Sequence, residues 1–270
     1  MTNPPVQHRF ELELEVPGSP DEVWQAIATA GGISSWMMDT ELEAREGGAV
    51  TFHMGPETES HGRVTAFEPS RRIEYAEDWA ELMGQAGADV TPLVTEFLVE
   101  ARSGGTCVVR VVTSAFGTGA DWENEFWGEM SSGWAPMLDN LRLYMTHFRG
   151  QQATQLWASA TCEGTPQTAV TAIRDALGIE GAVGQQVAVR DLSGVVERDL
   201  DRHFLIRVER PLTGMLSFFG YESGEGTTTV QVVGYLFGDD PASYVAREQE
   251  AWREWLAAAS AGIAADAPTA

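Results

Sequence analysis

One short opening occurs twice in this chain, and this repetition restricts the fold more than any other sequence feature. Gly-Ser-Pro at 18–20 corresponds to Gly-Thr-Pro at 164–166, and Gln-Ala-Ile at 25–27 corresponds to Thr-Ala-Ile at 171–173. There is no gap between the two matches. Ser and Thr are preferred N-caps, and proline fits the first turn of a helix. The repeat predicts a tandem duplication of one structural unit.

The first copy continues as one strand, helices, a meander and a closing helix. Residues 8–16 alternate between large apolar and charged side chains, which is the pattern of a half-buried strand. A short helical turn at 33–38 follows the capped helix. From 42 to 113, short apolar runs separated by turn residues indicate an antiparallel meander. Within it, the segment 80–92 is longer than a hairpin loop and predicts a flap. Residues 121–148 return to helical periodicity.

The second copy shows the same order of elements in fewer residues, and Asp240 and Pro241 open its last helix. We therefore expect a first domain at 1–148, a linker at 149–154, a second, shorter domain at 155–260 and a disordered tail at 261–270.

The charge of the chain argues against two classes of partner. Forty acidic residues stand against 17 basic ones, giving a net charge of −23, and every basic residue is arginine. Nucleic acids and anionic membranes are bound through basic patches, so we expect neither as a partner. The N-terminus has no signal-peptide pattern, which predicts a cytoplasmic protein. Abundant Ala, Gly and Arg without Lys suggest a GC-rich, bacterial genome.

Motifs for cofactors, metals and nucleophilic catalysis are missing. The chain contains no phosphate-binding loop, dinucleotide fingerprint, nucleophile elbow or zinc-protease motif, so we predict no cofactor. His53 and His61, with Glu57 or Glu59, invite a metal hypothesis. Strand parity places both histidines on the solvated face, and we assign no metal site.

Three separated stretches resemble one known family. They are VPGSPDEVWQAIATAGGISSWM at 16–37, AREGGAVTFHM at 44–54 and SSGWAPMLDNLRLYM at 131–145. They resemble the activator-of-Hsp90-ATPase-homologue family of the START/SRPBCC superfamily. The likeness covers 8–148 by motif, and 153–262 only by architecture. It implies an α+β fold of tandem helix-grip domains, each a curved antiparallel sheet wrapped around a long C-terminal helix.

The resemblance also implies a cavity between the concave sheet face and the closing helix of the first domain. Strand parity and helix periodicity suggest which side chains line it. Core packing is an equally open role for the tryptophans. The predicted lining residues are Trp36, Phe52, Met54, Tyr75, Glu77, Phe97, Val109, Trp127, Met130, Trp134, Leu138 and Leu141.

Glu77 is the weak candidate for catalysis, and no residue is assigned that role firmly. Glu77 is two residues after Tyr75 and four after Ile73, so all three side chains point to the same face of the predicted strand. Glu77 therefore faces either the cavity or water at the sheet rim. A carboxyl in an apolar pocket has a raised pKa and can act as an acid or base.

Gly133 and Pro136 lie within the closing helix and predict a kink or a fresh start at 132–136. Asp121 would then cap an earlier helix.

Three functions stay open. The first is binding of a small hydrophobic or aromatic ligand, and we place it ahead of the others because the expected cavity is rich in Met, Trp and Phe. The second is a protein-interaction module that regulates a chaperone of the Hsp90 type. The third is a cyclase- or dehydratase-like enzyme that uses a cavity carboxylate. Fold alone does not choose among them.

Overall fold

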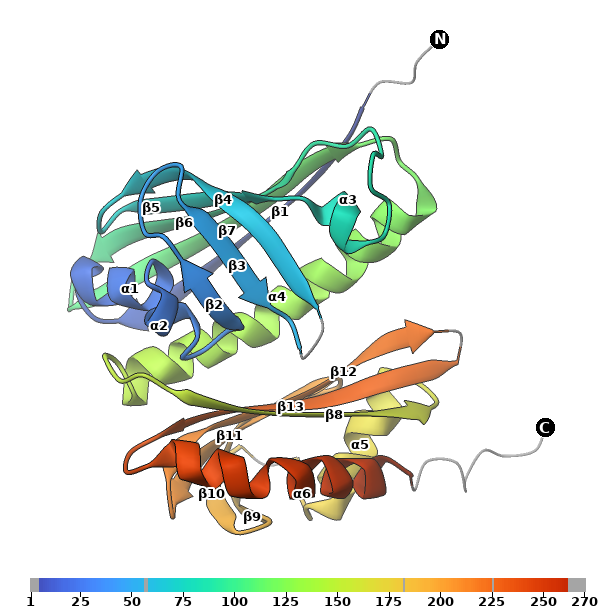
Figure 1. Ribbon diagram of the computed structural model, residues 1–270. Helices are drawn as coiled ribbons and strands as arrows, with labels where there is room; N and C mark the ends of the chain where they lie inside the picture. Colours follow the sequence, from blue (N-terminus) through green and yellow to red (C-terminus); the bar gives the residue numbers. More distant parts are fainter. Residues whose placement is uncertain (1–4, 56–57, 182, 225, 262–270) are drawn as a thin grey trace. The chain divides into compact units, whose positions relative to one another are not determined.

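The chain divides into two compact units. The structure is a computed structural model that describes residues 5–55, 58–181, 183–224 and 226–261. The first unit is formed by residues 1–152 and the second by residues 153–270 (Figure 1). Apart from Ala261, the predicted tail at 261–270 lies outside the described residues.

The first unit is a curved sheet with a long helix along its concave face (Figure 1). Its seven strands pair antiparallel in the order β1-β7-β6-β5-β4-β3-β2, so β1 closes beside the last strand of the meander. The elements are β1 (Val6–Pro17), α1 (Pro20–Ile27), α2 (Ala30–Ile33), β2 (Asp39–Leu42), β3 (Ala49–His53), β4 (Glu59–Glu68), β5 (Arg72–Glu77), α3 (Trp79–Leu82), β6 (Leu93–Arg102), β7 (Thr106–Gly117) and α4 (Asp121–His147).

The start of α1 follows from its sequence. Ser19 accepts a hydrogen bond from the Glu22 backbone N–H, and the Glu22 carboxylate accepts one from the Ser19 backbone N–H at 2.8 Å. This reciprocal pair satisfies two of the free N–H groups at a helix start. The predicted capping box at the first repeat is therefore confirmed.

Alternation of side chains along the strands builds the core of this unit. Val50, Phe52 and Val64 are almost completely buried, whereas His61 and Arg63 are exposed, as strand parity predicts. Met54 contradicts the parity prediction. It lies one residue past the end of β3 and is 40% exposed, because the pairing that fixes the alternation ends at His53.

The closing helix differs from the prediction. Residues Asp121–His147 form one helix with Pro136 inside it, so there is no fresh start at 132–136. Asp121 is not the cap, because Ala120 holds the N-cap position without a side-chain hydrogen bond. An internal proline costs a helix about 3 kcal/mol. Burial of Trp134, Leu138 and Leu141 against the sheet offsets this, since each large apolar side chain contributes about 1.5–3 kcal/mol.

The predicted flap contains a short helix. Asp78 accepts a hydrogen bond from the Glu81 backbone N–H at 3.0 Å and thereby begins α3. The Trp79 indole N–H donates to the Thr91 carbonyl at 2.8 Å and ties the end of the segment back to its start.

Among the described residues, the second unit repeats the plan with two helices and one strand fewer. Its sheet has the order β8-β13-β12-β11-β10-β9. Thr165 caps α5 as Ser19 caps α1, which confirms the prediction from the second repeat. Helices α5 and α6 pack on one sheet face over a core that includes Phe204, Phe218 and Trp252. The elements are β8 (Thr154–Glu163), α5 (Pro166–Ala176), β9 (Gln186–Val189), β10 (Leu192–Leu200), β11 (His203–Arg210), β12 (Thr213–Gly224), β13 (Thr227–Phe237) and α6 (Pro241–Ala261).

Both units therefore have the predicted α+β helix-grip architecture in tandem. In the part of the chain that the structure describes, no helix combines the length and apolar character needed to cross a bilayer.

Candidate functional site

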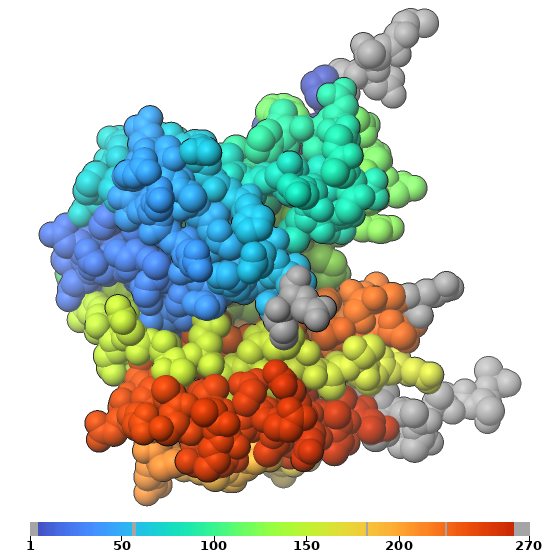
Figure 2. Space-filling view, viewed as in Figure 1, coloured from blue at the N-terminus to red at the C-terminus, as the bar shows by residue number. Residues whose placement is uncertain are grey.

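A cleft opens in the first unit between α3 and the beginning of β4. Its volume is about 520 Å³. The segment that contains α3 lies beside β4 on the visible surface (Figure 2). The lining residues are Thr58, Glu59, Ser60, His61, Asp78, Glu81 and Leu82.

The inner end of the cleft is a serine bonded to a carboxyl. The Ser60 hydroxyl donates to Oε2 of Glu77 over 2.5 Å, and Ser60 is only 3% exposed. A β-carbon on Gly62 would lie 2.9 Å from Glu77 Cγ and 3.1 Å from Val50 Cγ1. The Glu77 side chain therefore lies over Gly62, on the sheet face that also carries Val50. A larger residue at 62 would displace it.

The surroundings of Glu77 favour its protonated form. Burial raises the pKa of this carboxyl from 4.5 to about 7, against the opposing effect of the Ser60 hydrogen bond. Its other oxygen, Oε1, accepts no hydrogen bond from the residues that the structure describes. A carboxyl with a pKa near neutrality can exchange a proton or change charge when a ligand arrives.

Aromatic rings border this carboxyl. Phe52 lies opposite Ser60 in the strand register, and the centroids of Phe52 and Tyr75 are 5.1 Å apart. Burial raises the pKa of the Tyr75 hydroxyl well above its usual value, and the Glu77 charge adds to this. Tyr75 is therefore a neutral ring beside Glu77 at neutral pH.

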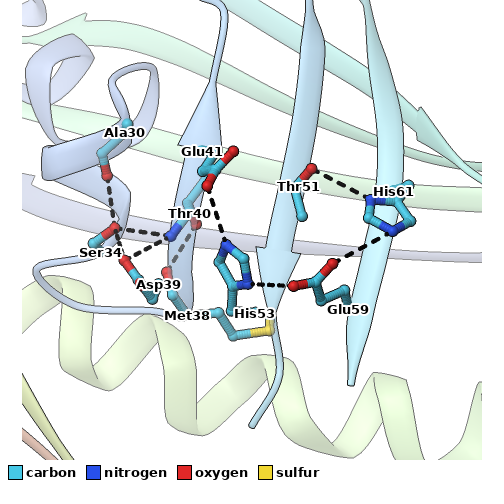
Figure 3. A network of polar contacts seen from close by, with 10 residues as sticks. All are labelled: Ala30, Ser34, Met38, Asp39, Thr40, Glu41, Thr51, His53, Glu59 and His61. Carbon is cyan, nitrogen blue, oxygen red and sulfur yellow. Dashed lines mark hydrogen bonds and ion pairs between the residues drawn. The ribbon is translucent and has the colours of Figure 1, made fainter. Parts of the chain in front are cut away.

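Carboxylates dominate the mouth of the cleft. Glu59, Asp78 and Glu81 line it, and the single group there that can carry positive charge among the described lining residues is His61. On the outer sheet face Glu59 lies between two histidines, 3.1 Å from His53 Nδ1 and 3.5 Å from His61 Nε2 (Figure 3).

These histidines belong to a chain of polar contacts. His53 Nε2 also lies 3.8 Å from a Glu41 oxygen, and His61 Nδ1 is 3.3 Å from the Thr51 hydroxyl (Figure 3). Within the described ranges, no three His, Cys, Asp or Glu side chains are grouped as metal ligands. Glu57, the other carboxylate of the metal hypothesis, lies outside those ranges.

The predicted lining residues divide into three groups. Trp36, Phe97 and Trp134 are buried in edge-to-face contacts, with centroids 6.4 Å apart for Trp36 and Phe97 and 5.6 Å apart for Phe97 and Trp134. Val109, Leu138 and Leu141 are also buried. Their role as ligand contacts stays a prediction.

The second group comprises Trp127 and Met130, which lie nearer the N-terminus of α4, in a cluster around Trp79. The third group comprises Phe52, Tyr75 and Glu77, which neighbour Ser60 in the sheet but are not among the lining residues of the cleft, and Met54, which is exposed just beyond β3.

Sequence reasoning missed the polar contacts beneath the Trp79 cluster. Glu123 is completely buried, and it accepts hydrogen bonds from the Thr118 backbone and hydroxyl at 2.9 and 2.7 Å and from the Gly119 backbone at 2.8 Å. Burial alone would raise the pKa of Glu123, but these hydrogen bonds and His8 outweigh it and lower the pKa to about 2. The sequence signal that could have revealed these contacts is a glutamate in the first turn of the helix, four residues after the second glycine of Gly-Thr-Gly at 117–119.

The sequence was then compared with known proteins. Residues 17–146 match the family model described as Activator of Hsp90 ATPase homolog 1-like protein. A search of the curated proteins found no match.

Several solved structures are similar to this chain. MLL2253 from Mesorhizobium loti is 18% identical, with a TM-score of 0.45, over 52% of this chain and 98% of that chain. DynU16, from the dynemicin biosynthetic locus, is 15% identical, with a TM-score of 0.44, over 95% and 97%. The di-domain ARO/CYC BexL, from the BE-7585A biosynthetic pathway, is 13% identical, with a TM-score of 0.43, over 96% and 99%.

Proposed function

The first unit of this chain belongs to the Activator of Hsp90 ATPase homolog 1-like family, and on this premise we propose that it binds a small apolar or aromatic molecule. The observation that supports this most is the cleft between α3 and β4, whose lining includes Ser60, which in turn donates a hydrogen bond to Glu77 behind it. Small-molecule sites are usually concave and contain a few convergent polar groups that orient the ligand.

The polar groups at the end of the cleft would orient the ligand. Ser60 already donates its proton to Oε2 of Glu77, which leaves Oε1 for a ligand atom. Leu82 is the apolar side chain among the described lining residues.

Native mass spectrometry of the purified protein, together with titration of a fluorescent apolar probe, tests this proposal. We expect one probe molecule to bind per chain. A matched pair of variants tests whether it binds in the cleft. Leu82→Trp narrows the cleft and weakens binding. Leu200→Trp changes a 41% exposed leucine of the second unit and leaves binding unchanged. Equal binding by both variants and the unaltered protein would place the probe elsewhere and contradict the proposal.

A second candidate function is regulation of an Hsp90-type chaperone, and it is favoured by the family description for residues 17–146. Its test is a pull-down with the Hsp90 homologue of the same organism and a measurement of that chaperone's ATPase rate. Failure to recover the chaperone, with no change of its ATPase rate, would eliminate this candidate.

A third candidate, an enzyme of the cyclase or dehydratase kind, needs a buried acid or base. Glu77 meets this need because burial raises its pKa to about 7. Once native mass spectrometry identifies a ligand, Glu77→Gln should abolish its turnover while it still binds. Unchanged turnover in that variant would remove the one acid or base on which the candidate depends.

A further inference from the structure

We propose that His203 is an acid-sensitive latch of the second unit: a second proton on its ring loosens strands β11 and β12 while the first unit stays folded. His203 is the single histidine of residues 153–270. The latch works without a ligand in the cleft, so it goes beyond the proposed function. Burial, a missing acceptor and the sign of the neighbouring charges support it.

The first support is the burial of the ring. His203 begins β11 and is 2% exposed, as is Ser217 on β12, and its Nε2 lies 3.1 Å from the Ser217 hydroxyl oxygen. Among the residues that the structure describes, Nδ1 has no hydrogen-bond partner. Both nitrogens of a charged ring carry a proton, so one N–H would lack an acceptor. A buried charge without a partner is strongly unfavourable.

The second support is the charge around the ring, which has the wrong sign for an imidazolium ion. Arg174 on α5 and Arg198 on β10 both disfavour the charged form of His203. Asp199 on β10 pairs with Arg174, at 2.6 Å. The other groups on adjacent segments are Asp201 and Arg202 in the turn before β11, and the uncharged Ser217 and Phe219 on β12.

Three histidines of the first unit are placed differently. His8 Nε2 lies 3.4 Å from Glu123, and His53 and His61 lie 3.1 and 3.5 Å from Glu59. A proton gained by any of them meets an adjacent carboxylate, which favours the positive charge. Mild acid therefore does not act on these histidines as it acts on His203.

The direction and size of the effect follow from the two states of the ring. Burial, and then the charges of Arg198 and Arg174, lower the pKa of His203 from 6.5 to about 4. The stability that the neutral ring contributes is complete above about pH 6.5 and is lost as the pH falls to about 4. Between about pH 7.5 and about pH 5, the equilibrium constant for opening of the segment should therefore rise about thirtyfold.

The first unit should respond to the same change in the opposite direction. Since burial raises the pKa of Glu77 to about 7, the first unit gains stability as the pH falls from about 7 to about 4.5. The pKa of Glu123 is lowered to about 2, so its contribution is kept near pH 5. Mild acid should therefore loosen the second unit and stabilise the first.

Hydrogen–deuterium exchange of the full chain, followed by mass spectrometry at about pH 7.5 and about pH 5, tests the latch. Peptides from 203–219 report on β11 and β12, and peptides from 93–117 report on β6 and β7. After correction for the intrinsic effect of pH on exchange, we expect the protection of 203–219 to fall about thirtyfold and that of 93–117 to be kept. Equal loss in both units, or no loss in the second, would overturn the inference.

Two variants locate the effect. His203→Gln should abolish the loss of protection, because glutamine can still form a hydrogen bond with Ser217 but does not titrate. His147→Gln is the matched control, since it replaces an exposed histidine in the last turn of α4 and should leave the loss unchanged. A loss that persists in His203→Gln would overturn the inference.

A measurement on the unaltered protein covers the case in which His203→Gln does not fold. NMR shifts of the ring nitrogens report the protonation of each histidine, and the ring of His203 can be identified through its contact with Ser217. We expect this ring to stay neutral at about pH 5. A ring that gains its second proton near pH 6.5 would overturn the inference.

Discussion

Replacement of Glu77 by glutamine should stabilise the protein at neutral and alkaline pH. Glutamine has nearly the same shape, and its side-chain oxygen can still accept the hydrogen bond from Ser60. What it lacks is the negative charge, whose burial raises the pKa of Glu77 to about 7.

The magnitude and sign follow from this raised pKa. The unfolded chain ionises near the ordinary value of 4.5, whereas the folded protein ionises Glu77 near 7. The free energy of unfolding therefore falls as the pH rises from about 4.5 to about 7 and then stays constant. A shift of this size corresponds to about 3 kcal/mol at most, and the partial exposure of Glu77 reduces the expected gain in Glu77→Gln to about 1–3 kcal/mol.

Urea unfolding of the unaltered protein and Glu77→Gln at about pH 4.5 and about pH 8 measures this difference. We expect nearly equal free energies of unfolding at the lower pH and a more stable variant at the higher pH. Glu46→Gln provides the control for a simple change in net charge. A variant that is less stable than the unaltered protein at both pH values would refute the account of a buried, destabilised carboxyl.

Three further changes test other parts of the first unit. Glu123→Gln should lower the free energy of unfolding by about 1–3 kcal/mol near pH 7 but have little effect near pH 2. The ionised Glu123 stabilises the fold above about pH 4.5, and this contribution is lost as the pH falls to about 2. Equal losses in urea unfolding at both pH values would contradict the assignment. Gly62→Ala puts a β-carbon 2.7 Å from the Ala76 carbonyl oxygen, so thermal and urea unfolding should show that the free energy of unfolding falls by about 1–3 kcal/mol. Unchanged stability would contradict this steric clash between β4 and β5. Ser19→Ala should cost about 1 kcal/mol through the lost helix cap, and an unchanged midpoint in urea would contradict the role of the capping box.

Local sequence signals predicted those parts of the fold that depend on neighbouring residues. The caps at Ser19 and Thr165 are set by side chains within three residues of the helix start. The alternation through Phe52 follows from the two-residue period of a strand. These features need no knowledge of distant contacts, and for this reason they could be read in advance.

The failures arose where distant packing decides the outcome. Pro136 suggested a break, yet the sheet that buries Trp134 and Leu138 holds the helix continuous. Met54 continued the strand pattern, but the pairing partner of β3 ends first. Burial against a surface built from other strands cannot be read from the local sequence.

The candidate site also combines features that the local sequence predicts with features that depend on distant contacts. Parity placed Glu77 among the possible lining residues, but its bond to Ser60 joins residues 17 positions apart and depends on the register of β4 and β5. The space for that side chain comes from Gly62, whose role appears only when the two strands lie side by side.

The most direct test of the central claim is an NMR titration of the Glu77 side-chain carboxyl carbon, with Glu77→Gln identifying its resonance. The account predicts a pKa of about 7, because burial disfavours the ionised carboxylate. A carboxyl that titrates near 4.5 would contradict it.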